Sequence, residues 1–169
     1  MIDVVEREDR AAGTYLERLF EQHERRLGQF LVHVVRDHAL AEDLLQETFL
    51  AAWRVRGELD SVVNPEAWLF GIARHRALRA LRGAQRLRRA LERVAAAPAA
   101  GVDEGPGPAV DVLALVHRVL GPEDRALVVL RNVHGFDATE LAEMTGRSPA
   151  AIRKRLERAR TSLLQEATR

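Results

Sequence analysis

The sequence predicts an all-α protein of two small helical domains joined by a flexible linker, the C-terminal domain being a helix-turn-helix. Apolar residues recur at steps of three and four along most of the 169-residue chain, which is typical of amphipathic helices. No run of alternating apolar and polar residues is long enough to demand a sheet. A segment rich in proline and glycine interrupts the helical pattern near the middle of the chain.

Two amphipathic helices are expected first. The first has a buried stripe that runs from Leu16 to Val35. The second includes the stretch AEDLLQETFLAAWR (41–54), and its apolar side carries Leu40, Leu44, Leu45, Thr48, Phe49, Ala52 and Trp53. The other faces of this helix carry Glu42, Asp43, Gln46, Glu47 and Leu50, so its carboxylates are predicted to be exposed.

A polar segment with helix breakers, RGELDSVVNPE (56–66), separates these helices from a third. Asn64 is a favourable N-cap residue, and Pro65 suits the first helical position. The third helix, AWLFGIARHRALRALR (67–82), is expected to bury its apolar side while its arginines cover the opposite side. Trp53 and Trp68 are both predicted to be core residues, since tryptophan at helical spacing with aliphatic residues usually packs inside.

The segment AAAPAAGVDEGPGPA (95–109) has three prolines, three glycines and scarcely a bulky apolar residue. Such a segment cannot bury enough surface to offset the entropy of ordering it. We therefore predict an N-terminal domain at 1–94, a flexible linker at 95–109 and a C-terminal domain at 110–169.

The C-terminal stretch DATELAEMTGRSPAAIRKRLERARTSL (137–163) carries the most specific local pattern. Asp137 and Glu140 form a capping box that opens a short helix, and Gly146 ends that helix. Ser148 then caps a new helix with Pro149 at its first position. A small residue at Ala142, the glycine turn and a branched residue at Ile152 follow the spacing of a helix-turn-helix.

The last helix has an apolar stripe of Ile152, Leu156, Ala159 and Leu163. Six basic residues lie between Arg147 and Arg160, against one acid, Glu157. A recognition helix needs such residues to anchor phosphates and to hydrogen-bond base edges in the major groove, which indicates DNA as the ligand. An αα-hairpin with a solvated basic face is the alternative.

Charge is unevenly distributed although the net charge is only +1. Eight arginines stand against one acid between Arg74 and Arg93, whereas six acids stand against two arginines between Asp37 and Asp60. Two basic surfaces and one acidic surface favour a protein that meets a polyanion and a second, different partner. For any single run, a solvated helix face is the simpler interpretation.

Nearly the whole chain, from about Tyr15 to Leu164, resembles the bacterial RNA polymerase sigma factors. AEDLLQETFLAAWR is similar to their polymerase-binding signature, and PEAWLFGIARHRALRALR (65–82) to the segment that melts and reads the minus-ten element. GPEDRALVVLRNVHGFDATELAEMTG (121–146) and RLERAR (155–160) resemble their C-terminal helix-turn-helix. The lack of a substantial middle domain resembles the small extracytoplasmic-function (ECF) group.

This resemblance implies an alternative sigma factor that binds core RNA polymerase and directs promoter-specific initiation. Its polymerase contacts on the beta-prime clamp helices would be Asp43, Gln46, Glu47 and Leu50. The loop from Gly57 to Pro65 would hold a flipped base, and the minus-ten contacts would be Asn64, Arg74, His75, Arg76 and Arg79. The minus-thirty-five contacts would be Ser148, Ala150, Ala151, Arg153, Lys154, Arg155 and Arg158.

The resemblance also implies further partners and some differences. Helix 122–135 would meet the beta flap, Asp103 and Glu104 of the linker would mimic nucleic acid near the RNA exit channel, and an anti-sigma factor would hold the protein inactive. His75 stands where the family usually has asparagine, and residues 149–154 replace a common Gly-Thr-Val-Lys-Ser run. The promoter sequence therefore does not carry over from the family.

Catalysis is not expected. The chain has no cysteine, so it offers no disulfide, thiolate zinc site or cysteine nucleophile. The six histidines form no HExxH motif and no phosphate-binding glycine loop occurs, so we expect no enzyme, no metal and no cofactor. The N-terminus is too charged for a signal peptide and no window of 18 residues is apolar, which predicts a cytoplasmic chain without membrane insertion.

Two other functions fit the pattern less fully. A conventional repressor or activator would join a helical effector or dimerisation domain to the helix-turn-helix and would bind a palindrome as a dimer. Such a protein binds its operator tightly alone, whereas a sigma factor becomes promoter-specific with core polymerase. A protein-interaction adaptor would need no DNA.

Overall fold

The computed structural model describes residues 2–94 and 112–168, and these residues form helices without a strand among them. The elements are α1 (Ile2–Val35), α2 (His38–Arg54), the 3-10 helix η1 (Arg56–Ser61), α3 (Pro65–Val94), α4 (Val112–Val119), α5 (Pro122–Asn132), α6 (Ala138–Thr145) and α7 (Pro149–Ala167). The predicted all-α class is confirmed. The predicted linker, with Asp103 and Glu104, lies outside the described residues.

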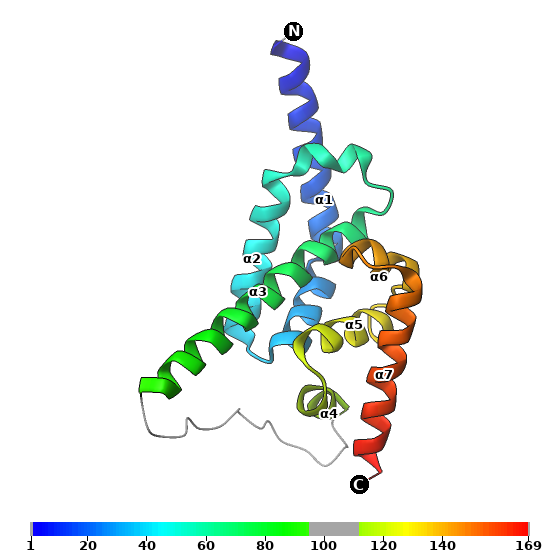
Figure 1. The fold of residues 1–169 in the computed structure, drawn as a ribbon. Coiled ribbons are helices and arrows are strands. Elements are labelled where there is room, and N and C mark those ends of the chain that lie inside the picture. Colours follow the sequence, from blue (N-terminus) through cyan, green and yellow to red (C-terminus); the bar gives the residue numbers. More distant parts are fainter. Residues whose placement is uncertain (1, 95–111, 169) are drawn as a thin grey trace.

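Helices α1, α2 and α3 form the N-terminal bundle. α2 runs back along α1, and α3 crosses both (Figure 1). The chain reverses at Arg36, which takes a positive φ of 55°, and the Asp37 carboxylate then caps α2 by accepting from the Leu40 backbone N–H at 2.9 Å. Two residues are enough for this reversal because the cap satisfies a free N–H of the new helix.

The segment between α2 and α3 is more ordered than its breaker composition predicts. Residues Arg56–Ser61 form η1, which buries Leu59 against the bundle. Leu59 is the single apolar side chain of η1, and its burial holds the turn on the bundle. The polar composition of the segment does not predict this contact. The predicted cap at Asn64 is confirmed, since its Oδ1 accepts from the Ala67 N–H at 3.0 Å.

Helices α1 and α3 are longer than their apolar stripes predict. α1 begins at Ile2, and α3 continues to Val94, past Leu87 and Leu91, which are 62% and 57% exposed. In α3, helix-favouring alanine, arginine and leucine carry the C-terminal end beyond the part that packs. Apolar periodicity marks buried faces and therefore underestimates the length of a helix with a projecting end.

The C-terminal turn chemistry follows the prediction closely. Asp137 accepts from the Thr139 and Glu140 N–H groups, and Glu140 accepts from the Asp137 N–H, which completes the capping box. Gly146 ends α6 with φ 65°, the left-handed conformation that glycine adopts at no steric cost. Ser148 caps α7 through the Ala151 N–H at 3.2 Å, and Ile152 is fully buried. The helix-turn-helix of α6 and α7 is confirmed.

One hydrophobic core runs through both halves of the chain. α5 and α6 pack on α1 and α3 (Figure 1), and the rings of Phe70 and Phe136 lie 5.0 Å apart. Leu127, Leu130 and Leu141 belong to the same buried cluster as Phe30 and Phe70. A smaller cluster of Val116, Leu120 and Ala159 holds α4 on α7. The sequence predicts two separate small cores, and here the two halves share most of one.

The two tryptophans pack at the edge of this core. Both side chains contact the cluster but stay partly exposed. The Arg56 guanidinium lies 4.7 Å from the centre of the Trp53 ring, a cation–π contact, and Trp68 lines a surface cavity. The prediction that they are core residues therefore holds in part: both pack on the core, but neither is fully buried.

His134 is buried where the two halves meet. Its ring lies 5.1 Å from that of Phe70, and its Nε2 has no hydrogen-bond partner. Burial, together with the smaller effects of the charges of Arg26 and His33, lowers the pKa of His134 to about 4. The folded protein therefore holds this imidazole neutral.

We expect His134 to make the fold sensitive to acid. At pH values between the folded pKa and the unfolded pKa near 6.5, the imidazole binds a proton in the unfolded chain but not in the native protein. The free energy of unfolding therefore falls as the pH falls through this range. The free energy of unfolding should drop by about 2 kcal/mol from pH 7 to pH 5 on account of this residue. Urea unfolding of wild type and His134→Phe at both pH values measures it, and equal pH dependence in the two proteins would contradict the assignment.

Candidate protein-docking and nucleic-acid surfaces

The outer face of α2 carries an exposed acidic surface. Helical periodicity buries Ala41, Leu44, Thr48 and Ala52, and the Thr48 hydroxyl donates to the Leu44 carbonyl at 2.6 Å. Glu42, Asp43, Gln46 and Glu47 are therefore exposed, and Leu50 between them is 53% exposed. The predicted exposure of the four residues proposed for polymerase binding is confirmed.

This acidic face continues across α1, which the sequence interpretation missed. A groove of about 640 Å³ between α1 and α2 has a floor of Phe20, Leu45, Phe49 and Leu50, and its rim carries Glu17, Glu21, Glu24, Glu42 and Gln46. The Phe20 and Phe49 rings meet edge to face at 5.0 Å. Among the described residues, no cation pairs with these four glutamates. The spacing of Glu17, Glu21 and Glu24 on one helix face was the available signal.

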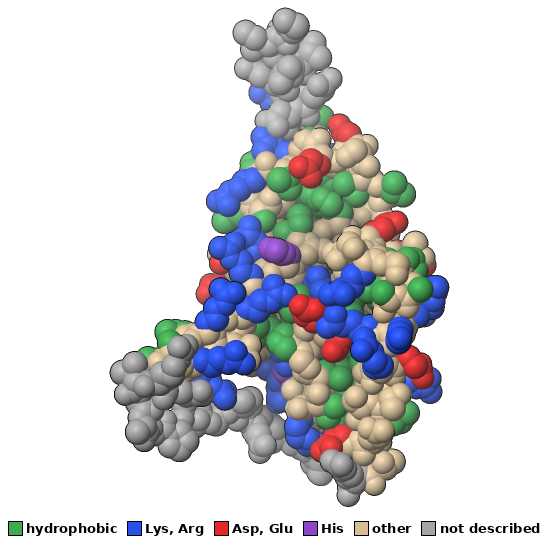
Figure 2. Space-filling model, in the orientation of Figure 1, with side chains coloured by type: hydrophobic (Ala, Val, Ile, Leu, Met, Phe, Trp, Pro, Cys, Tyr) green, Lys and Arg blue, Asp and Glu red, His purple; other side chains and the backbone are tan. Residues whose placement is uncertain are grey.

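The exposed face of α3 is basic. His75 and Arg79 are exposed, and Arg76 is partly exposed with its Nη1 3.7 Å from the Glu47 Oε2. Figure 2 shows a band of Lys and Arg side chains over the face of the molecule that carries α3 and α7. Three of the predicted minus-ten contacts therefore lie on an open cationic surface.

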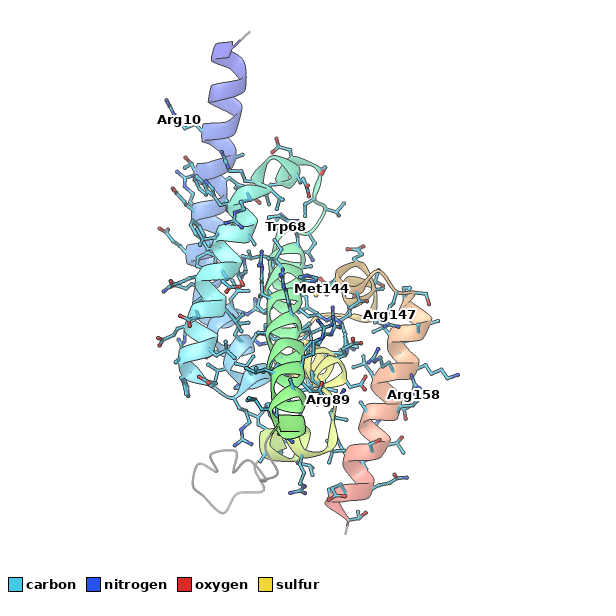
Figure 3. The ribbon with its side chains drawn as sticks, turned by 60° about the vertical axis from the view of Figure 1, so that its left-hand side comes forward. Arg10, Trp68, Arg89, Met144, Arg147 and Arg158 are labelled. Carbon is cyan, nitrogen blue, oxygen red and sulfur yellow. The ribbon has the colours of Figure 1, made fainter. Side chains whose placement is uncertain are left out.

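A cavity of about 620 Å³ lies at the beginning of α3. The loop before α3 contributes Val62, Val63 and Asn64, and α3 itself contributes Trp68, Ile72 and His75. Glu143 and Met144 of α6 also line it, and Figure 3 shows Met144 beside the part of α3 that carries Trp68. Of the loop 57–65 that is predicted to hold a flipped base, Val62, Val63 and Asn64 line this cavity, which has a mostly apolar lining and a wall from the other half of the chain.

Two predicted DNA contacts point inward instead. Arg74 is largely buried, its Nε has no hydrogen-bond partner, and burial lowers its pKa despite the opposing charge of Glu123. Arg155 donates through Nε to Asp124 and lies 3.1 Å from the Glu123 carboxylate through Nη2. Arg155 thus pairs with carboxylates of α5, whereas Arg74 only feels the charge of Glu123. Local helical periodicity cannot show this because the partner residues come from another helix.

The remaining predicted contacts of α7 lie on its open face. Ile152 and Ala159 of the apolar stripe are buried. The outer side carries the exposed residues Ser148, Ala150, Ala151, Arg153, Lys154 and Arg158. Figure 3 shows Arg158 directed away from the helical bundle. The exposed N-terminal turn and two flanking arginines give α7 the shape and charge of a helix that enters a major groove.

No group of three histidine, aspartate or glutamate side chains is arranged for a metal ion in the part of the chain that the structure describes. None of its described helices has the length and apolar character needed to cross a lipid bilayer.

Comparisons with known proteins match these surfaces to two regions of one family. Residues 19–87 match Sigma-70 region 2, and residues 111–163 match Sigma-70, region 4. The chain is 36% identical to the RNA polymerase sigma factor CarQ of Myxococcus xanthus, over 84% of this chain and 83% of CarQ. It is 32% identical to the ECF RNA polymerase sigma factor SigG of Mycobacterium tuberculosis, over 73% of this chain and 40% of SigG.

The fold also matches a solved structure. The sigma factor RpoE of Bartonella quintana, solved in complex with the anti-sigma factor NepR, superimposes with a TM-score of 0.69 at 24% identity, covering 88% of this chain and 94% of RpoE. The two matched sigma regions and the identity to CarQ indicate the same family, and the shared fold is consistent with it. The chain belongs to the extracytoplasmic-function group of bacterial RNA polymerase sigma factors, which direct promoter-specific initiation of transcription.

Proposed function

We propose that this sigma factor uses three separate surfaces for three partners. The acidic face of α2 binds the beta-prime clamp helices of core RNA polymerase, α3 with its cavity reads the minus-ten element, and α7 reads the minus-thirty-five element. The observation that supports this division is spatial: α2 lies on one side of α3 and α7 on the other in both ribbon views (Figures 1 and 3). Carboxylates and arginines can thus bind different partners at once.

The α2 surface suits a basic helical partner. Asp43 and Glu47 supply charge, Gln46 supplies hydrogen bonds, and the half-exposed Leu50 supplies apolar area. The groove toward α1 extends this surface with an apolar floor and a glutamate rim. Interfaces combine an apolar centre with a charged rim, and complementary charge speeds association and fixes register. We therefore include Glu21 and Phe20 in the proposed docking site.

The α3 surface suits single-stranded promoter DNA. Arg76 and Arg79 offer positive charge along the helix, and the cavity beside them has an apolar lining with Trp68 and Ile72. An unstacked base gains from an aromatic or apolar pocket, and a cationic groove holds the backbone. Asn64 at the cavity edge can read the base through its amide. Arg74 joins this surface only if it leaves its buried position.

The α7 surface suits duplex DNA. Ser148 and the following alanines present a slim N-terminal turn, and Arg153, Lys154 and Arg158 present exposed cations. Small residues allow close approach to base edges, and the cations contact phosphates or guanines. Arg155 pairs with Glu123 and Asp124 of α5, so we assign it to holding α7 in position and not to contacting DNA.

Other partners and boundaries follow the family. Residues 1–94 and 110–169 are proposed as two functional domains joined by a linker at 95–109, with α5 meeting the beta flap. RpoE was solved with an anti-sigma factor, and we propose that such a protein also controls this chain. Sigma factors are DNA-binding initiation factors, so we assign no reaction or cofactor of its own to this chain and place it in the cytoplasm with RNA polymerase.

Reconstituted transcription tests this proposal against a conventional repressor or activator. Purified core polymerase, with and without the protein, is supplied with fragments of the host genome. The proposal expects discrete transcripts only when both are present, and weak DNA binding by the protein alone. Tight binding of the free protein to a palindrome, without any core-dependent transcript, would favour the repressor and contradict the proposal.

A further inference from the structure

The cavity at the beginning of α3 has a second cavity beside it. This second cavity, of about 500 Å³, lies between α2 and α3, and both cavities are lined by Arg54 and Arg76. Arg79 adds a third guanidinium group to the second one. We call the first the apolar cavity and the second the cationic cavity. Because two arginines line both, one small molecule can reach apolar and cationic surroundings at the same time.

The apolar cavity suits the body of such a molecule. Its apolar lining comes from Val62 and Val63 of the loop, Trp68 and Ile72 of α3, and Met144 of α6 (Figure 3). Val63 is 96% exposed and Trp68 is partly exposed, so the protein itself leaves this apolar surface in contact with water. A ligand that covers it gains free energy from the burial, and a volume of about 620 Å³ is typical of small-ligand sites.

The amide of Asn64 offers little to a ligand in the apolar cavity. Its Oδ1 accepts from the Ala67 N–H at 3.0 Å, and its Nδ2 donates to the Glu140 Oε1 at 2.8 Å. Both ends of this amide therefore have partners within the protein. A ligand body with polar edges would leave those edges poorly paired, which costs free energy. In the free protein, the lining thus favours an aliphatic or simple aromatic body over a nucleobase.

The charged residues around the two cavities set the direction of a ligand. Arg54 is exposed at the end of α2, and no side chain pairs with it among the residues that the structure describes. Arg76 has one distant partner, the Glu47 carboxylate at 3.7 Å. Glu143 lines the apolar cavity from α6, which lies on the other side of α3 from α2 (Figures 1 and 3). An anionic head group is therefore attracted to the α2 end and repelled from the α6 end.

We propose that the two cavities together form a binding site for an amphiphilic anion, a small molecule with an apolar body and a single carboxylate head. The body fills the apolar cavity beside Trp68. The head binds Arg54 and Arg76, since guanidinium groups match carboxylates with paired N–H donors. The occupied site cannot receive an unstacked base, so the ligand inhibits minus-ten reading. This last consequence, unlike the binding itself, rests on the proposed role of α3.

Calorimetric titration of the full chain tests the site with three probes that share one alkyl chain: decanoate, decanol and decylammonium. Below their micelle concentrations, decanoate should bind at least about tenfold more tightly than the other two, because only its head group is attracted to the arginines. Naphthoate carries the same head on an aromatic body, so its affinity shows whether an aliphatic or an aromatic acid fits better. Equal affinity for the three decyl probes, or no binding of either acid, would overturn the proposal.

Arg54→Gln removes one cation of the proposed head-group site. It should weaken decanoate binding about fivefold or more and leave decanol binding unchanged. The matched control is Arg18→Gln, which removes an exposed arginine of α1 that lines neither cavity and should leave both affinities at wild-type values. Equal losses of decanoate affinity in the two variants would mean that net charge, and not this site, attracts the anion.

Ala51→Leu tests the apolar end of the site. Ala51 of α2 lines the apolar cavity and is only partly buried, so a leucine there takes up part of the cavity volume. The variant should bind decanoate and naphthoate at least about fivefold more weakly, while circular dichroism and thermal unfolding stay close to those of wild type. Undiminished binding by the folded variant would place the ligand elsewhere and contradict the proposal.

Transcription separates the site from its consequence. Decanoate should inhibit run-off transcription by core polymerase with the wild-type protein, and with Arg54→Gln the same fractional inhibition should need about fivefold more decanoate. Equal inhibition of the two would show that decanoate acts on another part of the system, against the proposed competition. Wild-type protein that fails to initiate without any ligand contradicts the proposed function and leaves the binding result standing. Normal initiation without decanoate binding overturns only the ligand site.

Discussion

Reversing the charge of two residues on α2, Asp43→Arg with Glu47→Arg, should weaken binding to core polymerase on the order of a hundredfold. Both side chains are exposed, so the change replaces attraction to a basic helix by repulsion without disturbing the core. The only ion pair lost among the described contacts of these two residues is the 3.7 Å approach of Glu47 to Arg76, which is too exposed to matter for folding. Titration of labelled protein with core enzyme measures the loss, and circular dichroism checks the fold.

A matched control separates docking from net charge. Glu58→Arg with Asp60→Arg makes the same charge change on exposed residues of η1, outside the α2 surface, and should leave core affinity within about twofold. Glu21→Arg on α1 should have an intermediate effect, because Glu21 lies on the rim of the groove. Equal losses for the α2 and η1 pairs would mean that general electrostatics, and not this surface, holds the polymerase.

Removing three cations from α7, by Arg153→Ala, Lys154→Ala and Arg158→Ala together, should abolish most recognition of the minus-thirty-five element. All three side chains are exposed on the outer face of the helix. The holoenzyme should bind promoter DNA at least about tenfold more weakly. If all three side chains contact phosphates, the slope of log K against the logarithm of the salt concentration should become less negative by about 2 to 3. Core binding should be unchanged, since α2 is untouched.

Arg118→Ala is the control for this triple variant. Arg118 is an exposed arginine of α4 whose Nη2 lies 3.6 Å from the Glu166 carboxylate near the C-terminal end of α7, and it is not among the residues proposed to contact DNA. It should leave both promoter affinity and the salt slope at wild-type values. A triple variant with wild-type promoter affinity and salt slope would show that α7 does not contact DNA in the initiation complex.

Local chemistry made the C-terminal half predictable. The capping box at Asp137 and Glu140, the left-handed Gly146 and the cap at Ser148 each depend on residues within four positions of one another. Such signals can be read directly from the sequence because the hydrogen bonds they specify close locally. The exposed acids of α2 were predictable for the same reason, since one helix period decides which side chains face the core.

The packing of one half on the other was not predictable. His134 becomes a buried neutral imidazole because Phe30 and Phe70, from distant parts of the chain, pack against it. Arg155 follows helical spacing as a surface residue, yet α5 brings Glu123 and Asp124 against it. The charge of Glu123 also acts on Arg74, which is partly buried. Contacts between segments far apart in the sequence leave no periodic pattern, and the capping role of Glu140 concealed its second role as the partner of Asn64.

Cross-linking in the initiation complex tests the central claim, that three surfaces serve three partners. A cysteine-free chain allows a photoreactive group to be placed at one site at a time, with Gln46→Cys on α2, Arg79→Cys on α3 and Lys154→Cys on α7. We predict that position 46 cross-links to the beta-prime subunit, position 79 to minus-ten DNA and position 154 to minus-thirty-five DNA. Cross-links from position 46 to DNA, or from position 154 to polymerase alone, would contradict the account.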